Sequence, residues 1–121
     1  YVADYSNHRI RKIVISTGAV TTLAGSSSGN TDATGTSARF NSPRGITTDG
    51  TNLYVADYGN HRIRKIVIDN GTVTTLAGSS SGFADNATGT SAKFNRPAGI
   101  TTDGTNLYVP DYSNNRIRKI E

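Results

Sequence analysis

The chain has 121 residues, with 13 lysines and arginines against 9 aspartates and glutamates, 13 glycines, and no cysteine, methionine or tryptophan. This length suits one domain of ordinary size, and the lack of cysteine excludes disulfides, thiolate zinc sites and thiol nucleophiles. Two histidines cannot build a three-imidazole metal site within one chain, and no apolar run is long enough to span a membrane. Because the sequence begins at Tyr1 and contains no methionine, we interpret it as an excised, processed or engineered piece.

Almost the whole chain is an internal repeat. Residues 1–25 return as 54–78 with four differences, at an offset of 53. Residues 39–53 return as 93–107, and a third copy begins at Tyr108. Self-similarity at such a period is typical of repeat architectures, so it decides the fold before any single element does.

Turn residues divide one repeat into four short predicted strands: 45–48, 53–56, 61–68 and 72–76. The Asp49-Gly50 pair between the first two is a frequent hairpin signal, and Asp69-Asn70-Gly71 turns the third strand into the fourth. No segment combines helical periodicity with capping residues, so we expect little helix. Three successive hairpins predict a four-stranded antiparallel meander, which is followed by a Ser/Gly/Thr/Ala-rich stretch from Ala77 to Pro97.

A four-stranded meander repeated about every 50 residues is typical of a β-propeller blade, whose sheet packs both faces on neighbouring blades. Burial on both faces would explain why apolar residues break the two-residue alternation in the third strand, at Ile10, Ile13, Val14 and Ile15. A β-solenoid is the alternative, but its repeats are much shorter. We therefore predict an all-β chain of about two and a half propeller blades.

The predicted division of the chain has three parts. Residues 1–25 form a partial blade of strands two to four. Residues 26–78 form a loop and a complete blade, and residues 79–121 form a loop and a partial blade of strands one to three. In the last part Pro110 replaces Ala56, and because proline cannot donate to a strand ladder we expect an irregularity there.

The segment from Pro43 to Ile66 reads Pro-x-Gly-Ile-x-x-Asp, then Asn-Leu-Tyr-Val-Ala-Asp, then Asn-His-Arg-Ile-Arg-Lys-Ile. This pattern resembles the NHL repeat, with Arg62 in place of the leucine in the name-giving Asn-His-Leu. The resemblance implies propellers of about six blades. The family includes protein-binding and RNA-binding platforms, exported bacterial arrays, and related propeller lyases and lactonases. For a parent protein of the bacterial type it implies an extracellular or periplasmic location, which the residues themselves leave open.

An incomplete propeller predicts self-association. An open arc exposes apolar blade faces and unpaired sheet edges to water. We expect a homodimer or a homotrimer that completes the propeller, in which the repeated strands of 1–13 and 108–120 compete for one place. A head-to-tail contact that does not close would instead extend into a fibre.

Nine of the 13 basic residues lie in three Arg-x-Arg-Lys runs: Arg9, Arg11 and Lys12; Arg62, Arg64 and Lys65; Arg116, Arg118 and Lys119. Clustered basic residues can bind a polyanion by releasing counterions from phosphates, which makes the runs weak candidates for such a site. Alternate residues of a strand point to opposite faces, however. We therefore favour a structural role, in which each run is split between two faces and pairs with Asp4, Asp57 or Asp111.

Asp49 and Asp103 are weak candidates for calcium ligands, because calcium binds oxygen and these turns are rich in it. The loops at Asp32 and Asp85 raise the same question. Asp-Gly turns need no metal, so we favour hydrogen bonds from the turn backbone to the aspartate side chains. No cofactor is expected.

His8 and His61 occupy aligned positions before the third strand. Their near-identical surroundings lack the distinct acid and base roles of a catalytic pair, so we predict a hydrogen bond across the blade turn and no enzyme activity. The favoured function is a non-enzymatic scaffold that self-assembles, with a protein or carbohydrate as candidate ligand on its loops. A polyanion- or RNA-binding module is the alternative, and a relative of propeller lyases or lactonases ranks third.

Overall fold

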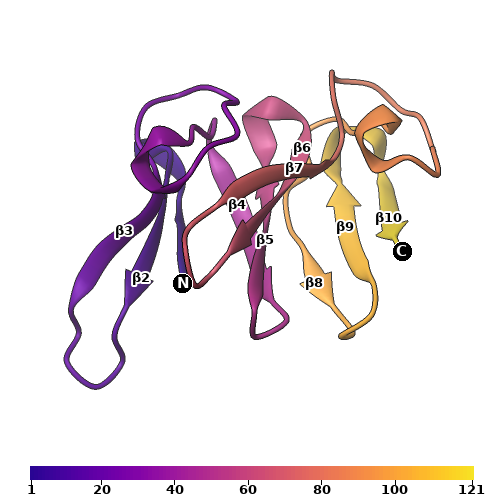
Figure 1. Cartoon of the computed structure of the whole chain (residues 1–121). Coiled ribbons are helices and arrows are strands. Elements are labelled where there is room, and N and C mark those ends of the chain that lie inside the picture. The colour runs from indigo at the N-terminus through magenta and orange to yellow at the C-terminus, as the bar shows by residue number, and fades with distance from the viewer.

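A computed structural model describes all 121 residues and contains ten strands in three antiparallel sheets, with no α-helix (Figure 1). The first sheet contains β1 (Val2–Asp4), β2 (Arg9–Ile13) and β3 (Val20–Gly25). The middle sheet contains β4 (Pro43–Thr48), β5 (Asn52–Asp57), β6 (Arg62–Val67) and β7 (Val73–Ala77). The third sheet contains β8 (Thr101–Thr102), β9 (Leu107–Asp111) and β10 (Arg116–Ile120). The predicted all-β meander is confirmed.

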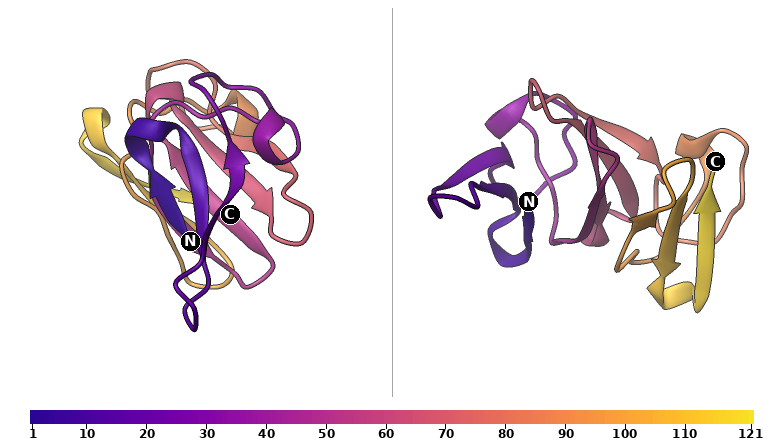
Figure 2. Two further views of the ribbon diagram at one scale, coloured as in Figure 1. Left: turned by 90° about the vertical axis from the view of Figure 1, so that its left-hand side faces the viewer. Right: turned by 90° about the horizontal axis from the view of Figure 1, so that it is seen from below.

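The three sheets stand side by side in chain order and form an open arc (Figures 1 and 2). Within each sheet, strands that follow one another in sequence are also hydrogen-bonded neighbours. The N-terminus lies on the first sheet and the C-terminus on the third, at opposite ends of the arc (Figure 2). The structure contains no helix long and apolar enough to cross a membrane.

Two apolar clusters hold the arc together, one on each face of the middle sheet. The cluster toward the first sheet contains Ile10, Ala24, Ala38, Phe40, Leu53, Val55, Ile66 and Val73. The cluster toward the third sheet contains Ala56, Ile63, Ala77, Ala92, Phe94, Leu107 and Val109. Ile63 and Ile66 of β6 belong to different clusters, so the third strand of this blade is buried on both faces, as predicted.

The same explanation is wrong for two residues of the first copy. Val14 and Ile15 follow the end of β2 and lie in the hairpin loop before β3. Ile15 is 99% exposed. The apolar residues that follow Ile13 therefore lie beyond the end of β2, where no neighbouring sheet buries them.

Pro110 lies opposite a shortened strand. β8 has two residues, whereas the aligned strand β4 has six. In the middle sheet Ala56 pairs with Gly45 of β4, but Pro110 has no N–H to donate at the aligned position. Only its carbonyl is used, as the acceptor for the Ala98 N–H at 3.0 Å. The predicted irregularity is present and accounts for the short strand.

Candidate functional site: the charged clusters and the two end faces

The middle sheet buries a cluster of charged side chains, which we call the arginine cluster: Arg64, Asp57 and Asp32. Arg64 of β6 is fully buried, and its Nη1 donates to Asp57 Oδ2 at 2.8 Å while its Nη2 donates to Asp32 Oδ1 at 2.6 Å. The two nitrogens also donate to the carbonyls of Arg39 and Thr31, each at 3.0 Å. A buried guanidinium needs such partners, because an unpaired charge in an apolar interior is costly.

Asp57 lies at the end of β5 and is fully buried. Its Oδ1 accepts the N–H of Asn41 at 2.8 Å, and its Oδ2 accepts Asn60 Nδ2 at 2.8 Å besides Arg64. Burial raises the pKa of Asp57 above its ordinary value, and these hydrogen bonds together with the Arg64 charge oppose that rise. The hydrogen bonds fix both oxygens of the carboxylate.

Asp32 joins three parts of the chain. It lies in the loop that precedes the middle sheet and contacts Arg64 of the third strand. Its Oδ2 also accepts the N–H of Thr75 at 3.0 Å, and its Oδ1 accepts Thr75 Oγ1 at 3.1 Å. Thr75 belongs to β7, the fourth strand, so Asp32 ties a loop to a strand 43 residues further along the chain.

The third sheet repeats this cluster without a fourth strand. Arg118 Nη1 donates to Asp111 Oδ2 at 2.9 Å, and Arg118 Nη2 donates to Asp85 Oδ1 at 2.5 Å. The Asp85 side chain is 80% exposed, whereas the aligned Asp32 side chain is 44% exposed. No threonine donates to Asp85, so one of its oxygens is left without a protein partner.

The first sheet has the fourth strand but lacks the loop carboxylate of the cluster. Arg11 Nη1 donates to Asp4 Oδ2 at 3.1 Å, as Arg64 does to Asp57, but no carboxylate corresponds to Asp32. Thr22 of β3, which aligns with Thr75, has no carboxylate partner. The first sheet therefore holds the threonine and the third sheet holds the loop aspartate of an unfinished cluster.

The outward face of the first sheet, called the first end face, exposes apolar side chains. Three residues of the middle sheet that face the first sheet are 0–1% exposed: Val55, Ile66 and Val73. The aligned residues of the first sheet are 41–50% exposed: Val2, Ile13 and Val20. These side chains occupy positions that the middle sheet buries against a neighbouring blade.

The outward face of the third sheet, called the last end face, is exposed in a corresponding way. Ile117 of β10 aligns with the buried Ile63 and is 70% exposed. It pairs with Pro110, just as Ile63 pairs with Ala56. The two end faces are thus the two unlike sides of one kind of blade contact.

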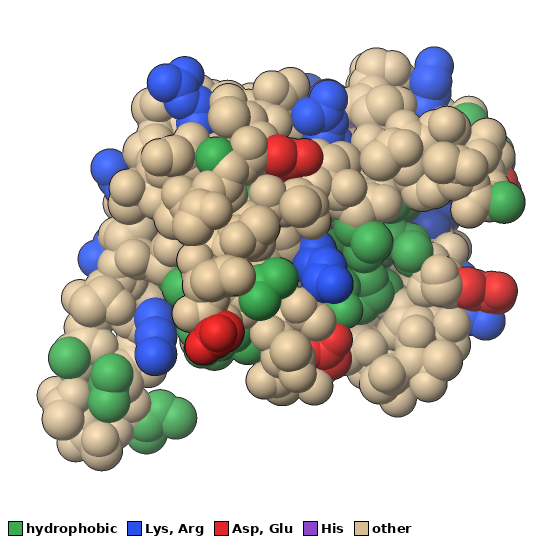
Figure 3. Space-filling model, in the orientation of Figure 1, with side chains coloured by type: hydrophobic (Ala, Val, Ile, Leu, Met, Phe, Trp, Pro, Cys, Tyr) green, Lys and Arg blue, Asp and Glu red, His purple; other side chains and the backbone are tan.

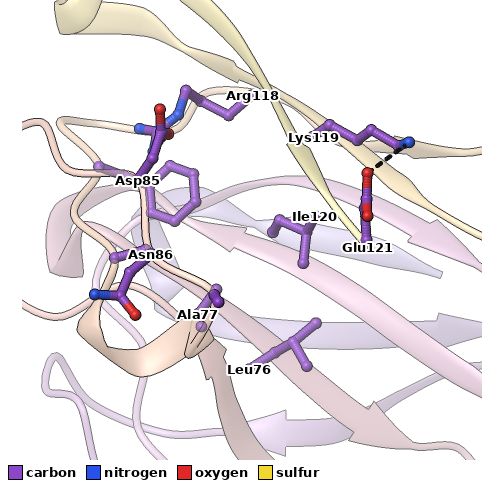
Figure 4. A pocket seen from close by; sticks show the side chains of 12 residues that line it. Leu76, Ala77, Asp85, Asn86, Arg118, Lys119, Ile120 and Glu121 are labelled. Atoms are coloured by element: carbon purple, nitrogen blue, oxygen red, sulfur yellow. Dashed lines mark hydrogen bonds and ion pairs between the residues drawn. The ribbon is translucent and has the colours of Figure 1, made fainter.

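A cavity of about 610 Å³ lies beside β10, where the third sheet lacks a fourth strand. Figure 4 shows Leu76 and Ala77 across the cavity from Ile120, with Asp85 beside Arg118. Between the first and middle sheets, the residues aligned with Leu76, Ala77 and Ile120 are Leu23, Ala24 and Ile66. These three pack in one cluster with the buried side chain of Val73. Hydrophobic side chains gather in a hollow between the middle and third sheets in the space-filling view (Figure 3).

The repeat carries a recognised family pattern. The family model for the NHL repeat matches residues 40–66, which run from the entry loop of the middle sheet into β6. The chain is an array of NHL repeats. The resemblance inferred from the sequence is confirmed, since the matched segment contains the motif that carried it.

Curated proteins are similar to the chain over its whole length. NHL repeat-containing protein 2 of Homo sapiens is 40% identical over 136 residues, which cover all of this chain and 18% of the human protein. Protein SUPPRESSOR OF QUENCHING 1, chloroplastic, of Arabidopsis thaliana is 32% identical over the whole chain, which spans 12% of that protein. The chain thus spans less than a fifth of the length of these relatives.

Solved structures show the same arrangement of blades. A protein of unknown function from Bacteroides thetaiotaomicron superposes with a TM-score of 0.87 at 28% identity, over 97% of this chain and 30% of that one. An auxiliary nutrient binding protein from Bacteroides ovatus superposes with a TM-score of 0.82 at 28% identity, over 97% of this chain and 33% of that one. The NHL array has the fold of a segment of these larger chains.

The three basic runs of the NHL array are split as the strand geometry predicts. The second arginine of each run turns inward: Arg11, Arg64 and Arg118 pair with Asp4, Asp57 and Asp111. The other six residues are half-buried or exposed and belong to three separate sheets: Arg9, Lys12, Arg62, Lys65, Arg116 and Lys119. On the face drawn in Figure 3 the basic side chains lie apart. The structure does not bring the nine residues together.

Asp49 serves its own hairpin. Its Oδ1 accepts the N–H groups of Thr51 at 2.9 Å and Asn52 at 2.7 Å, and its Oδ2 accepts the hydroxyl of Tyr54 at 2.8 Å. Asp103 repeats these hydrogen bonds in the third sheet. The backbone donors hold the pKa of both carboxyls well below their usual range. The structure contains no group of three or more histidine, cysteine, aspartate or glutamate side chains that could hold a metal ion.

The two histidines bind the next repeat. His8 Nδ1 accepts the N–H of Ser42 at 3.0 Å, and His61 Nδ1 accepts the N–H of Arg96 at 3.1 Å. The prediction of a hydrogen bond across the blade's own turn is therefore wrong. Burial, and then the charge of Arg96, lower the pKa of His61, in keeping with a ring nitrogen that accepts a hydrogen bond.

Sequence reasoning also missed the role of the loop aspartates and of the threonine in the fourth strand. Asp32 and Asp85 were considered only as oxygen ligands, and Thr22 and Thr75 were not considered at all. The available signal was their alignment, since each pair recurs at the repeat period. Alignment alone did not indicate that the two positions meet.

Proposed function

We propose that this NHL-repeat array is a non-enzymatic scaffold that self-associates through its two end faces and presents its loops to a ligand. The observation that supports this most directly is the exposure of Val2, Ile13 and Val20, at positions where the middle sheet is fully buried. Fully burying a large aliphatic side chain stabilises by about 1.5–3 kcal/mol. Covering the remaining exposed half of each would therefore contribute about 1 kcal/mol per residue.

The shapes of the two end faces favour a head-to-tail contact. The last end face resembles the side of the middle sheet that packs on the third, and the first end face resembles the side that packs on the first. Joining unlike faces generates a ring when the rotation closes, as a dimer or a trimer, and a filament when it does not. The curvature of the arc favours a closed ring (Figure 2).

Binding is proposed in preference to catalysis. One structural neighbour is described as a nutrient binding protein. Asp49 and Asp103 are committed to their own hairpins, and both histidines to the neighbouring repeat. The candidate surface is the exposed part of the two long loops between the sheets, where a protein or a carbohydrate is the candidate ligand.

Polyanion binding receives less support. One arginine of each basic run is occupied by aspartates, and the remaining basic residues are divided among three sheets. If RNA or heparin bound here, the affinity would fall steeply as salt is raised, because released counterions supply most of such binding.

The test of self-association is the solution mass, measured by light scattering over a range of protein concentrations. We expect a discrete dimer or trimer. Ile13→Glu places a charge on the first end face and should give a folded monomer, whereas Ile15→Glu, in the exposed hairpin loop, should leave the mass unchanged. A folded wild-type chain that stays monomeric at every concentration would refute the proposal.

A further inference from the structure

We propose that the hairpin turn between β6 and β7 carries an acceptor site for an N-linked glycan, at Nδ2 of Asn70. The triplet Asn70-Gly71-Thr72 has the Asn-x-Thr pattern of such acceptors. The turn belongs to the middle sheet and is complete within one chain, so this inference does not depend on the self-association proposed above. It concerns a covalent modification of the chain and goes beyond ligand binding.

The acceptor pattern is absent from the matching turn of the first copy. Residues 1–25 and 54–78 differ at four positions, and three of the four lie in this turn. Thr17-Gly18-Ala19 in the first copy corresponds to Asn70-Gly71-Thr72 in the second, so two substitutions together complete the triplet. The few differences between two nearly identical repeats are thus concentrated in one turn, and they create the acceptor pattern there.

The fold of the turn does not explain these substitutions. Gly18 and Gly71 have nearly the same φ, 73° and 72°. The N–H of each glycine donates to the carbonyl four residues earlier, at 2.7 Å and 2.8 Å. In both turns the side chain before the glycine accepts the N–H two residues further on, at Thr17 Oγ1 with 3.2 Å and at Asn70 Oδ1 with 2.9 Å. Either sequence therefore builds the same hairpin.

The Asn70 side chain leaves its nitrogen available. Asn70 is exposed, and the hydrogen bond to its Oδ1 leaves Nδ2 with no partner in the chain. Other asparagines use Nδ2 to hold the fold together, since Asn60 donates to Asp57 and Asn52 donates to Asp49. The free Nδ2 of Asn70 is the atom to which an N-linked glycan is attached.

The co-reactant is a sugar that is activated at C1 by a lipid-linked diphosphate, and a glycosyltransferase brings it to the turn. The bond between Asn70 Nδ2 and C1 of the sugar forms as the bond between C1 and the diphosphate oxygen breaks. The lipid diphosphate leaves with the electron pair, and one Nδ2 proton passes to a base of the transferase. No atom is oxidised or reduced. The chain supplies only the acceptor nitrogen and the Thr72 hydroxyl that the pattern requires.

The preceding loop determines when the site can react. Two backbone hydrogen bonds of 2.9 Å join residues 33–35 to Gly71 and Val73. Thr72 is half-buried, and its hydroxyl lies 3.4 Å from that of Thr34. A transferase that reads the whole triplet needs the turn before this loop docks on it. We therefore expect the glycan to be added to the growing chain, and only slowly to the folded one.

The test is cell-free translation of the whole chain behind a secretory leader, with microsomes that contain the transferase and its lipid-linked oligosaccharide. The chain has a second triplet, Asn86-Ala87-Thr88, so every variant also carries Asn86→Gln. We expect a product larger by one glycan, which returns to the unmodified mass after treatment with peptide N-glycosidase. Asn70→Gln and Thr72→Ala should each abolish this gain, whereas Thr72→Ser should retain it, because serine also completes the pattern.

The first copy offers a matched gain-of-function control. Thr17 and Ala19 are both exposed, in a turn of the same shape. In a chain that also carries Asn70→Gln, Thr17→Asn alone should remain unmodified. Thr17→Asn combined with Ala19→Thr should regain one glycan, because the two changes together transplant the triplet.

A version of the chain with an acceptor triplet on an appended flexible tail reports entry into the microsomes. If the tail is modified and Asn70 is not, the proposal is refuted, whatever the oligomeric state of the chain. If the purified, folded chain is modified as fast as the growing one, the inferred effect of residues 33–35 is refuted. A glycan that is lost with Asn70→Gln and regained with the transplanted triplet supports the proposal.

Discussion

Removing the carboxylate of Asp57 is the sharpest test of what stabilises the middle blade. Asp57→Ala deletes the acceptor of three hydrogen bonds, from Arg64, Asn60 and the N–H of Asn41, at a position that is fully buried. Breaking a buried ion pair by removing one partner costs about 3–5 kcal/mol. Arg64 and Asn60 each keep a backbone carbonyl as acceptor, so we expect the lower end, about 3 kcal/mol.

The assay is equilibrium unfolding in urea, followed by circular dichroism. For slopes of about 1–3 kcal/mol per molar urea, a loss of about 3 kcal/mol lowers the midpoint by roughly 1–3 M. Asp69→Ala is the matched control, because Asp69 lies in an exposed hairpin turn and makes no side-chain hydrogen bond. That variant should stay within about 0.5 kcal/mol of the wild type.

The protein concentration must be held fixed in this comparison, since association stabilises the folded chain by mass action. An Asp57→Ala variant that unfolds within about 0.5 kcal/mol of the wild type would refute the reasoning. The arginine cluster would then be a consequence of the fold and not a source of its stability.

Three further predictions concern other contacts between and within the repeats. Because folding lowers the pKa of His61, the stability that this residue contributes is present above about pH 6.5 and is lost as the pH falls through the pKa of the folded state. Urea midpoints between pH 5 and 8 should show this loss, and the His61→Asn variant, which introduces the residue type that the third copy has at position 115, should show a weaker pH dependence. Gly45→Ala should destabilise the fold by about 1–3 kcal/mol in thermal unfolding, because the added Cβ would lie 2.6 Å from Gly99 Cα. Gly99→Ala should be nearly neutral in the same assay, because its Cβ would meet only the Pro110 side chain at 3.5 Å. Calcium should leave the melting temperature unchanged, because both oxygens of Asp49 already accept hydrogen bonds within the hairpin, and a rise on adding calcium would show that these bonds yield to a metal.

Local sequence signals were sufficient to predict the blade itself. The Asp-Gly turn placed the hairpin between β4 and β5, and the turn at 69–71 separated β6 from β7. Pro110 predicted the irregularity beside β8 because the loss of an N–H is a local property. Packing on both faces of β6 followed from apolar residues that break the two-residue alternation of the strand. These features depend on residues that are neighbours in sequence or in one hairpin.

Contacts between repeats were beyond the same signals. The hydrogen bond from Ser42 to His8 joins residues 34 apart, and the contact of Asp32 with Thr75 joins residues 43 apart. Two-residue periodicity says which side of a strand a residue faces, but it says nothing about which loop approaches that side. The role of the loop aspartates therefore became visible only when the sheets were placed beside one another.

The histidine contact has a consequence for how such chains lengthen. His8 binds Ser42 and His61 binds Arg96 through a backbone N–H, so the contact does not depend on which side chain the following repeat carries at that position. A duplication that inserts one whole repeat would bring its own copy of this junction. Repeat arrays are stabilised largely by contacts between neighbours, so the new unit would find a fitting surface at once. Unequal exchange between similar copies can then add or remove blades without first evolving an interface.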